Sequence, residues 1–247
     1  MARQARQMSD TGFFHVIVRG IGKQILFEEF SDNKYYLWLL ERYSSETNVS
    51  VCAYCLMENH VHLLVRDKEG ELPLFMKKLG VSYSAYFNKK YERSGHLFQD
   101  RYRSEAVNDD PYLLSVFRYI LKNPQAAGIC SFDQYPWSSY KLYGKRSSFV
   151  DTELLCGMLG SFEHYYEFLS EDTEDDCMEY YPAKITDERA KQLIKDKLGI
   201  ESGVAIQSYD REKRDEAINK LIKAGLSERQ IERLTGINRR IIHSIIW

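Results

Sequence analysis

CLMENHVHLLV (Cys55–Val65) places two histidines one residue apart inside an apolar run. Residues i and i+2 of a β-strand project from the same face about 7 Å apart, so His60 and His62 can reach one ion together. Val61 between them then points to the opposite face, where it can pack in a core. On its own the pair fits a metal site and two structural imidazoles equally well.

Strand-like runs flank this stretch on both sides. The runs rich in β-branched and aromatic residues are FFHVIVRG (13–20), VSVCAYCLM (49–57), VHLLVRD (61–67) and RSEAV (103–107). The short segment ENH between the second and third runs is compatible with a hairpin turn or a bend. The sequence therefore predicts up to four strands in the first half of the chain.

Three segments of the same region carry apolar residues at helical spacing. They are SDNKYYLWLLERYSSET (31–47), ELPLFMKKLGVSYSAYFNKKY (71–91) and DPYLLSVFRYILKN (110–123). Ser31 or Asp32 is the expected N-cap of the first helix, and Asp110 that of the third, which should end before Pro124. Because strands and helices mix without repeated strand–helix–strand units, we predict an α+β fold, a ferredoxin-like antiparallel sheet with helices on it.

The last part of the chain is predicted to be an all-α helical extension with a helix-turn-helix. One helix ends at Gly225, and a second opens with Ser227 followed by Gln230, the pattern of a capping box. The second helix stops at Gly236, and a third begins around Asn238. Helices joined by tight glycine turns in this order are typical of a helix-turn-helix.

Charge on this extension is locally positive. From residue 208 on, nine Lys and Arg residues stand against six Asp and Glu residues, and Arg239 and Arg240 lie near the start of the last predicted helix. A helix-turn-helix lays that helix in the major groove, so these two arginines are the expected duplex DNA contacts. A small three-helix packing module is the alternative.

The expected domains are residues 1–145, a helical connector over 146–182, and the helix-turn-helix domain over 183–247. Between Glu167 and Glu179 the chain has seven acidic residues and no basic one. Such a run is solvated and self-repelling, which predicts an acidic linker inside the connector.

Composition leaves the partner open. The chain has 247 residues, is 44% hydrophobic and carries a formal net charge of -2, so any nucleic-acid contact must come from local patches. Five cysteines and the lack of a run of membrane-spanning length favour a cytoplasmic protein with no membrane partner. Cys52 and Cys55 form a C-x-x-C, but three residues apart on a strand they should face opposite sides, which disfavours a zinc site.

One local basic patch lies between Asn88 and Arg103. Five basic residues are interleaved there with Tyr91, Phe98 and Tyr102, namely Lys89, Lys90, Arg93, Arg101 and Arg103. Cations for phosphates and rings for bases are the combination that binds single-stranded nucleic acid. The alternative is a basic, solvated helix end.

On the helix predicted over 110–123, Tyr119 and Asn123 lie one turn apart, opposite the main apolar stripe. The chain has 18 tyrosines, so a tyrosine packed against a neighbouring element is the ordinary interpretation of Tyr119. The motifs around it decide between that interpretation and a chemical role.

Three motifs in order resemble the HUH-type single-tyrosine transposases, in particular the REP-associated tyrosine transposases. They are the H-hydrophobe-H of residues 60–62, GHLFQDRYRS (95–104) and RYILKNPQAAG (118–128), with WSSY (137–140) after them. The likeness covers roughly residues 12–140, more than half the chain. Members of that family often end soon after WSSY, whereas this chain continues for about a hundred residues, in which GLSERQIERLTGI (225–237) resembles the DNA-binding end of bacterial replication initiators.

The resemblance implies a divalent metal ion, magnesium or manganese, held by His60, His62 and Asn123, with Tyr119 as the nucleophile. Attack by Tyr119 would cut single-stranded or hairpin DNA, leaving a 5'-phosphotyrosine and a free 3'-hydroxyl, and would retain the bond energy for rejoining. Two imidazoles and one amide oxygen leave such an ion several positions for phosphate oxygens and water. The expected function is a metal-dependent DNA transposase, acting as a monomer or a homodimer.

Three other functions stay open at this point. The chain could be a non-catalytic DNA-binding regulator that uses its helix-turn-helix, a domesticated endonuclease, or a phosphoesterase whose nucleophile is water. A pure binder has no need of His60, His62, Tyr119 and Asn123 together. An enzyme that used water would still cut DNA after Tyr119→Phe.

Overall fold

The computed structural model describes residues 9–145, 149–171, 173, 175, 177–178 and 187–246. The chain divides into two compact units, Met1–Tyr180 and Tyr181–Trp247, and each is described here by itself. The expected domain boundaries at 145/146 and 182/183, and acidic residues 172, 174, 176 and 179 of the expected linker, border on or lie outside the described residues.

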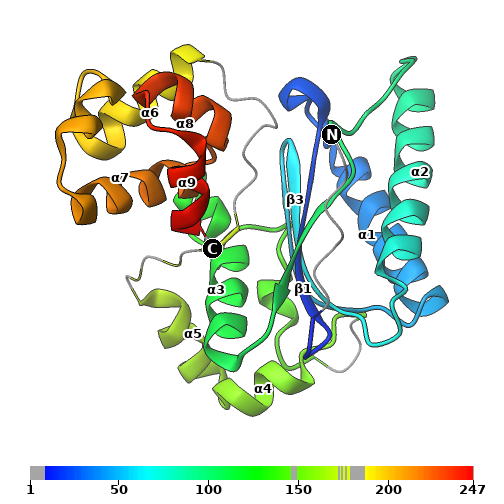
Figure 1. Ribbon diagram of the computed structural model, residues 1–247. Helices are drawn as coiled ribbons and strands as arrows, with labels where there is room; N and C mark the ends of the chain where they lie inside the picture. Colours follow the sequence, from blue (N-terminus) through cyan, green and yellow to red (C-terminus); the bar gives the residue numbers. More distant parts are fainter. Residues whose placement is uncertain are drawn as a thin grey trace. The chain divides into compact units, whose positions relative to one another are not determined.

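An antiparallel sheet forms the centre of the first unit (Figure 1). Its strands, in the spatial order β2-β3-β1-β4, are β1 (Phe13–Arg19), β2 (Ser50–Met57), β3 (His60–Arg66) and β4 (Arg103–Val107). Helix α1 (Phe30–Glu46) connects β1 to β2, and α2 (Leu72–Lys90) connects β3 to β4. This order and connectivity confirm the predicted ferredoxin-like α+β fold.

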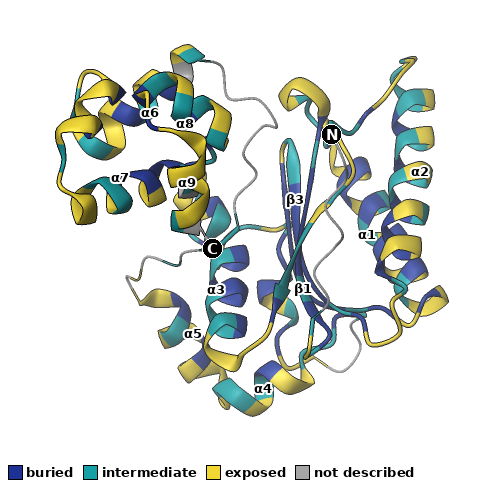
Figure 2. Ribbon diagram, viewed as in Figure 1, coloured by how far each residue is buried: buried dark blue, intermediate teal, exposed yellow. Residues whose placement is uncertain are grey.

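The two faces of the sheet carry separate hydrophobic cores. Alternate residues of β3 such as Val61 and Leu63 pack under α1 and α2, whereas Leu64 packs in the core under α3 (Asp110–Ala126). Figure 1 shows α1 and α2 on one side of the strands and α3 on the other, and Figure 2 shows the strands largely buried between them. Strand parity therefore decides which set of helices a side chain meets.

Helix α3 departs from the sequence prediction at both ends. Its N-cap is Asp109, one residue earlier than expected, because the Asp109 carboxylate accepts a hydrogen bond from the Tyr112 backbone N–H at 2.8 Å. Pro124 lies inside the helix rather than beyond it. The missing proline N–H falls in the last turn, where the Ala127 and Ile129 N–H groups still bond to the Asn123 and Pro124 carbonyls.

Helices α4 (Glu153–Leu159) and α5 (Phe162–Ser170), which fall in the predicted connector, belong to the core under α3 through Leu155, Tyr165 and Leu169. A 3₁₀ turn at Ser139–Leu142 precedes them, and another lies at Ile21–Lys23.

Two acidic residues of the predicted linker are bound to α3, and the Asp175 side chain is buried while that of Glu171 stays exposed. Arg118 makes a bidentate pair with Asp175, at 2.8 and 2.7 Å, and donates to Glu171 at 3.0 Å. The fixed fork of the guanidinium matches the carboxylate geometry, which outweighs the tendency of an acidic run to stay in water.

The C-x-x-C residues also differ from expectation. The register of β2 shifts between Val51 and Ala53, as in a β-bulge, and Cys52 and Cys55 both join the core under α3. A bulge inserts one residue and thereby changes strand parity, so the prediction that the two thiols face opposite sides is wrong. Burial raises the pKa of both thiols above the ordinary value.

The second unit has its own core, built from helices and one 3₁₀ segment. These are α6 (Asp187–Leu198), η3 (Gly203–Ser208), α7 (Arg211–Lys223), α8 (Glu228–Thr235) and α9 (Arg239–Ile246). Ser227 and Gln230 form the predicted capping box, and Gly236 ends α8 in the left-handed conformation at φ 72°. Across both units, no described helix combines the length and apolarity that crossing a bilayer requires.

Asp32 ties α1 to α2 from a fully buried position. The N-cap of α1 is Glu29, not Ser31 or Asp32, and Asp32 completes the capping box from the N3 position. The Asp32 carboxylate accepts hydrogen bonds from the backbone of Glu28 and Glu29, the hydroxyls of Tyr86 and Tyr91, and the Lys90 ammonium. Burial alone would raise the pKa of Asp32, but the bonds from Lys90, Tyr91, Glu29 and Tyr86 lower it below the ordinary value.

Replacing Asp32 with asparagine should destabilise the first unit by about 3 kcal/mol at pH 7, because Lys90 loses its buried partner. Since the pKa of Asp32 is depressed in the folded state, its contribution is fully present above the ordinary value of 3.8 and is lost as the pH falls further. Urea unfolding followed by tryptophan fluorescence at pH 7, 4 and 2.5 should therefore show the difference from wild type shrinking with acidification. The exposed Asp100→Asn is the control, and an equal difference at all three pH values would contradict this role.

Candidate active site

Helix α3 brings Tyr119 over the two histidines of β3. The ring centroids of His62 and Tyr119 are 5.5 Å apart, and those of His60 and His62 are 5.0 Å apart. Nδ1 of His60 lies 2.7 Å from Oδ1 of Asn59, and the Asn123 side chain is close enough to raise the pKa of His60. The four residues singled out from the sequence therefore meet within one chain, on the α3 face of the sheet.

Local geometry explains this meeting. His60 and His62 share strand parity with Leu64, which packs under α3, while Val61 packs under α1 and α2. Tyr119 and Asn123 are four residues apart on α3, so they lie one turn apart on the same face of the helix. Pro124 lies at the end of that helix and leaves Asn123 inside the regular turn.

Both β3 histidines are neutral at neutral pH. Burial lowers the pKa of His62, which is 2% exposed, well below its ordinary value, and the neighbouring His15 and His60 lower it further. Burial lowers the pKa of His60 to about 4. The Asn123 side chain raises this pKa as a hydrogen-bond acceptor for the protonated ring, and the charge of Arg19 lowers it. Neutral imidazoles keep a lone pair for a ligand, which protonated ones do not.

Two site residues were missed by the sequence analysis. His15 of β1 is completely buried, its Nε2 lies 3.1 Å from Nδ1 of His62, and burial lowers its pKa to about 3. Arg19 stands opposite His60 in the β1–β3 register. Both have the strand parity of the α3 face, but only the register between two distant strands shows which residues they meet.

Among the described residues, no three His, Cys, Asp or Glu side chains come together in a group that could hold an ion. A site at His60 and His62 would take its third protein ligand from the Asn123 amide, which already lies against His60. Two neutral nitrogens and one amide oxygen form an incomplete set that leaves coordination positions for a substrate.

The expected DNA contacts in the basic patch fall into two groups. The Lys90 ammonium is bound by Asp32 at 2.6 Å and Glu29 at 3.0 Å, and Arg93 lies over the Phe87 ring. Lys90 therefore joins α2 to α1, and Arg93 packs on a core residue of α2. The remaining three, Lys89, Arg101 and Arg103, are exposed.

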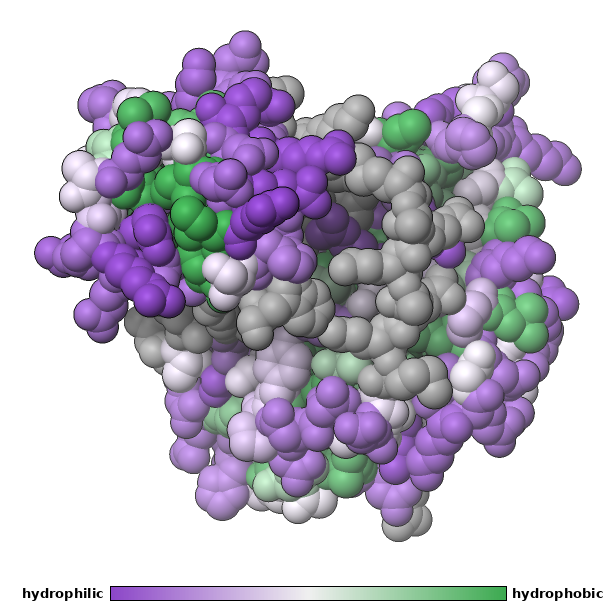
Figure 3. Space-filling model, in the orientation of Figure 1, coloured by the Kyte–Doolittle hydropathy of each residue, from purple (hydrophilic) through white to green (hydrophobic). Residues whose placement is uncertain are grey.

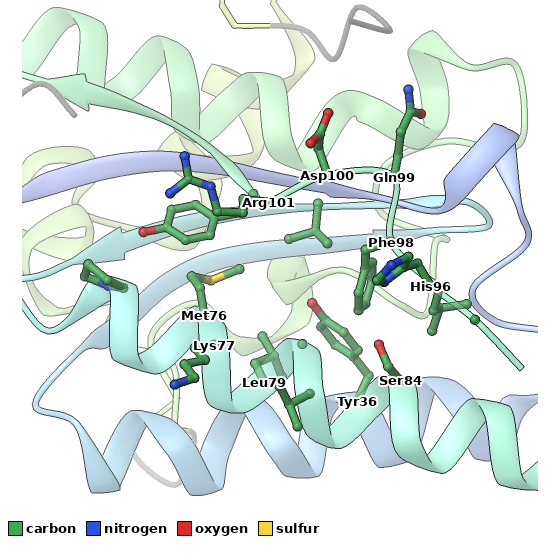
Figure 4. A pocket seen from close by; sticks show the side chains of 17 residues that line it. Tyr36, Met76, Lys77, Leu79, Ser84, His96, Phe98, Gln99, Asp100 and Arg101 are labelled. Carbon is green, nitrogen blue, oxygen red and sulfur yellow. The ribbon is translucent and has the colours of Figure 1, made fainter. Parts of the chain in front are cut away.

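A cavity of about 840 Å³ opens beside α2, on the face of the sheet under α1 and α2 (Figure 4). Met76 and Leu79 of α2 and Phe98 of the 95–102 segment line it, and Arg101 lies at its edge. The Tyr36 hydroxyl is buried without a hydrogen-bond partner among the described residues and points into the cavity.

The Ile21 N–H donates to the Leu97 carbonyl and the Gln99 N–H donates to the Arg19 carbonyl, which holds the wall of this cavity against the end of β1. Arg19 is the residue opposite His60, so the cavity and the histidine pair lie near the same end of the sheet, on opposite faces.

In the second unit, the two arginines expected to contact DNA differ in their surroundings. Both are exposed, and Arg239 also donates to Glu228 at 2.9 Å. Among the residues coloured in Figure 3, hydrophilic side chains predominate, with smaller hydrophobic groups between them.

Comparison with known proteins gives a family and a fold. The model of the IS200-like transposase family matches residues 11–123, which contain β1 to β4 and the four site residues. A solved REP-associated tyrosine transposase bound to a REP hairpin shares the fold with a TM-score of 0.52 and 13% identity, over 60% of this chain and 87% of that one.

A candidate transposase from Deinococcus radiodurans R1 aligns over 53% of this chain and 99% of its own, with 16% identity and a TM-score of 0.34, too low to support a conclusion. No curated protein matches the chain.

The neighbours of His60 should move its pKa in opposite directions. Asn123→Ala removes a hydrogen bond that raises the pKa of His60, so the pKa should fall below about 4, whereas Arg19→Ala removes a charge that lowers it, so the pKa should rise. Histidine C2 proton shifts, followed by NMR, report both changes. In the wild type the His60 signal should stay constant between pH 8 and 5, and a midpoint near the ordinary 6.5 would contradict the buried, neutral imidazole.

Proposed function

In residues 11–123 the chain belongs to the IS200-like transposase family, and from that membership we propose that it cuts and rejoins single-stranded or hairpin DNA through a 5'-phosphotyrosine at Tyr119. The observation that carries the proposal is the packing of the Tyr119 ring against the His62 imidazole, whose centroid lies 5.0 Å from that of His60. The chain would work in the cytoplasm, as a monomer or a homodimer.

The proposed reaction exchanges one phosphodiester for another. The Tyr119 oxygen attacks the phosphorus atom, the bond from phosphorus to the 3'-oxygen breaks, and the 3'-oxygen leaves as a hydroxyl after taking a proton. The 5'-phosphate stays on Tyr119, so the free 3'-hydroxyl of another strand can reverse the step and restore a DNA bond. The phenol proton is lost on the way, and a phenol with an ordinary pKa of about 10 needs help to lose it at pH 7.

His60, His62 and Asn123 are the residues that would hold a divalent metal ion. Bound there, magnesium or manganese would polarise the phosphate and favour the phenolate. The oxygen preference of magnesium and the open positions beside two nitrogens and an amide suit a phosphate ligand. His60 and His62 contribute by staying neutral, and the α3 packing contributes by holding the Tyr119 ring against His62.

The cavity beside α2 supports an unpaired strand as the substrate. Apolar and aromatic walls suit the face of a base, and Arg101 suits a phosphate at the rim. The solved REP-associated transposase of similar fold is bound to a hairpin, which favours the same DNA class here.

The second unit is proposed to read duplex DNA. Helices α8 and α9 follow each other across the Gly236 turn, and Arg240 is exposed at the start of α9. Because this unit is compact on its own, a regulator that binds DNA without cutting it is the second candidate function. The domesticated endonuclease and the water-using phosphoesterase would need the site of the first unit as well.

Tyr119→Phe should abolish the covalent protein–DNA complex and slow strand cutting by about 10³-fold or more, because the attacking oxygen is gone. The measurement uses labelled hairpin-containing single-stranded DNA with Mg²⁺ or Mn²⁺ and a denaturing gel. Tyr112→Phe is the matched control, since Tyr112 lies on the same helix and its hydroxyl bonds to Glu105 instead. Cutting by Tyr119→Phe at the wild-type rate would show that water is the nucleophile, and binding without cutting by the wild type would favour the regulator.

Arg101→Gln should weaken binding to single-stranded DNA and reduce the slope of log K against log salt by about 0.7, the value for one phosphate contact. Fluorescence anisotropy between 50 and 300 mM salt measures both quantities. Lys34→Gln, at an exposed position on α1, is the charge-matched control. If both variants changed the slope equally, the contribution of Arg101 would be the general charge of the protein rather than a local contact.

A further inference from the structure

We propose that His15 is a positioning residue that holds the His62 imidazole in the tautomer protonated on Nδ1, so that Nε2 of His62 keeps its lone pair for the metal ion. The inference rests on the proposed function, because it concerns the same site. It adds a residue of β1 that contacts neither the proposed ion nor the DNA and acts through His62.

The contact between the two rings involves one proton. Nε2 of His15 lies 3.1 Å from Nδ1 of His62, and both imidazoles are buried. Two ring nitrogens at this distance share one N–H, since two facing lone pairs or two facing protons would repel. The hydrogen bond therefore has two possible directions.

Only one direction is compatible with a ligand on His62. If His62 donates through Nδ1–H, its Nε2 carries a lone pair, and the His15 proton lies on Nδ1. If His15 donates through Nε2–H, the His62 proton lies on Nε2, which then cannot coordinate a metal ion. Metal-bound histidines usually donate their other N–H to an acceptor, and Nε2 of His15 is placed to be that acceptor.

His15 lowers the stability of the fold through an unpaired buried nitrogen, which supports a role for this residue beyond packing. Its Nδ1 is buried and has no hydrogen-bond partner among the described residues. Leaving a buried polar atom unpaired costs about 1–3 kcal/mol, and an apolar residue between Phe14 and Val16 would avoid that cost. The bond to His62 is what the histidine provides in return.

His15 also fixes the plane of the His62 ring. The two rings stack at 26° with centroids 5.4 Å apart, and the Tyr119 ring meets His15 edge-on at 5.8 Å and 70°. The His62 ring is thus held between the stacked His15 ring and the edge-on Tyr119 ring. A change at His15 reaches both the ligand and the nucleophile without touching the DNA.

The test measures metal binding and the tautomer directly. Mn²⁺ affinity is determined by calorimetry for the wild type, His15→Phe and His15→Gln. Phenylalanine keeps a stacked ring without an acceptor, so affinity should fall by about 10–100-fold. Glutamine can place its Oε1 near the position of Nε2 and should restore most of the affinity, whereas a merely structural role would be served better by phenylalanine than by glutamine.

The tautomer is read from ¹⁵N–¹H correlations of the imidazoles with saturating Mg²⁺, with the His62 signal assigned by comparison with His62→Asn. The wild type should show His62 protonated on Nδ1, and His15→Phe should lose this preference. His164→Phe, which removes an exposed histidine of α5, is the control and should change neither readout.

The outcomes separate this inference from the proposed function. If the wild type binds Mn²⁺ and forms the covalent DNA complex, but His15→Phe binds Mn²⁺ equally well, the role of His15 is overturned and the function stands. The same holds if Mg²⁺-loaded wild type carries the His62 proton on Nε2. If the wild type binds neither Mn²⁺ nor Mg²⁺, the metal site and the role of His15 fall together.

Discussion

The pairing of β1 with β3 is the constraint on which the proposed site depends. Side chains alternate along β3, so a shift of one residue would turn His60 and His62 toward α1 and α2 and bring Val61 under Tyr119. The register also sets Arg19 opposite His60. The apolar residues of β3 that hold the strand in the two cores thereby hold the imidazoles in place as well.

Burial keeps the site histidines neutral, and it also leaves a polar atom unpaired in the interior. A solvated histidine pair would be partly protonated near neutral pH and would repel a cation, whereas burial keeps His60 and His62 neutral. The same burial leaves an unpaired nitrogen on His15 in the interior. Placing the site at one end of the sheet, where His60, Tyr119 and Asn123 are only half-buried, gives a phosphate access without hydrating the inner histidines.

Strand and helix periodicity were sufficient to predict the sheet, α3 and the common face of His60 and His62. The family resemblance selected Tyr119 among the tyrosines, which periodicity alone could not do. His15 was missed because a single histidine in an apolar strand has no local signal, and its bond to His62 arises from pairing across 47 positions. The bond between Lys90, a predicted DNA contact, and Asp32 has no local signal either, because it depends on how α2 meets α1.

The central claim is that one phosphate can be reached at once from the paired imidazoles and from the Tyr119 hydroxyl. A crystal structure with hairpin DNA and Mn²⁺, using anomalous scattering to locate the ion, tests it most directly. We expect one Mn²⁺ bound to nitrogens of His60 and His62, with a phosphate oxygen on the ion and the Tyr119 oxygen about 3–3.5 Å from that phosphorus atom. An ion bound elsewhere, or a DNA phosphate on these histidines that Tyr119 cannot reach, would contradict the account.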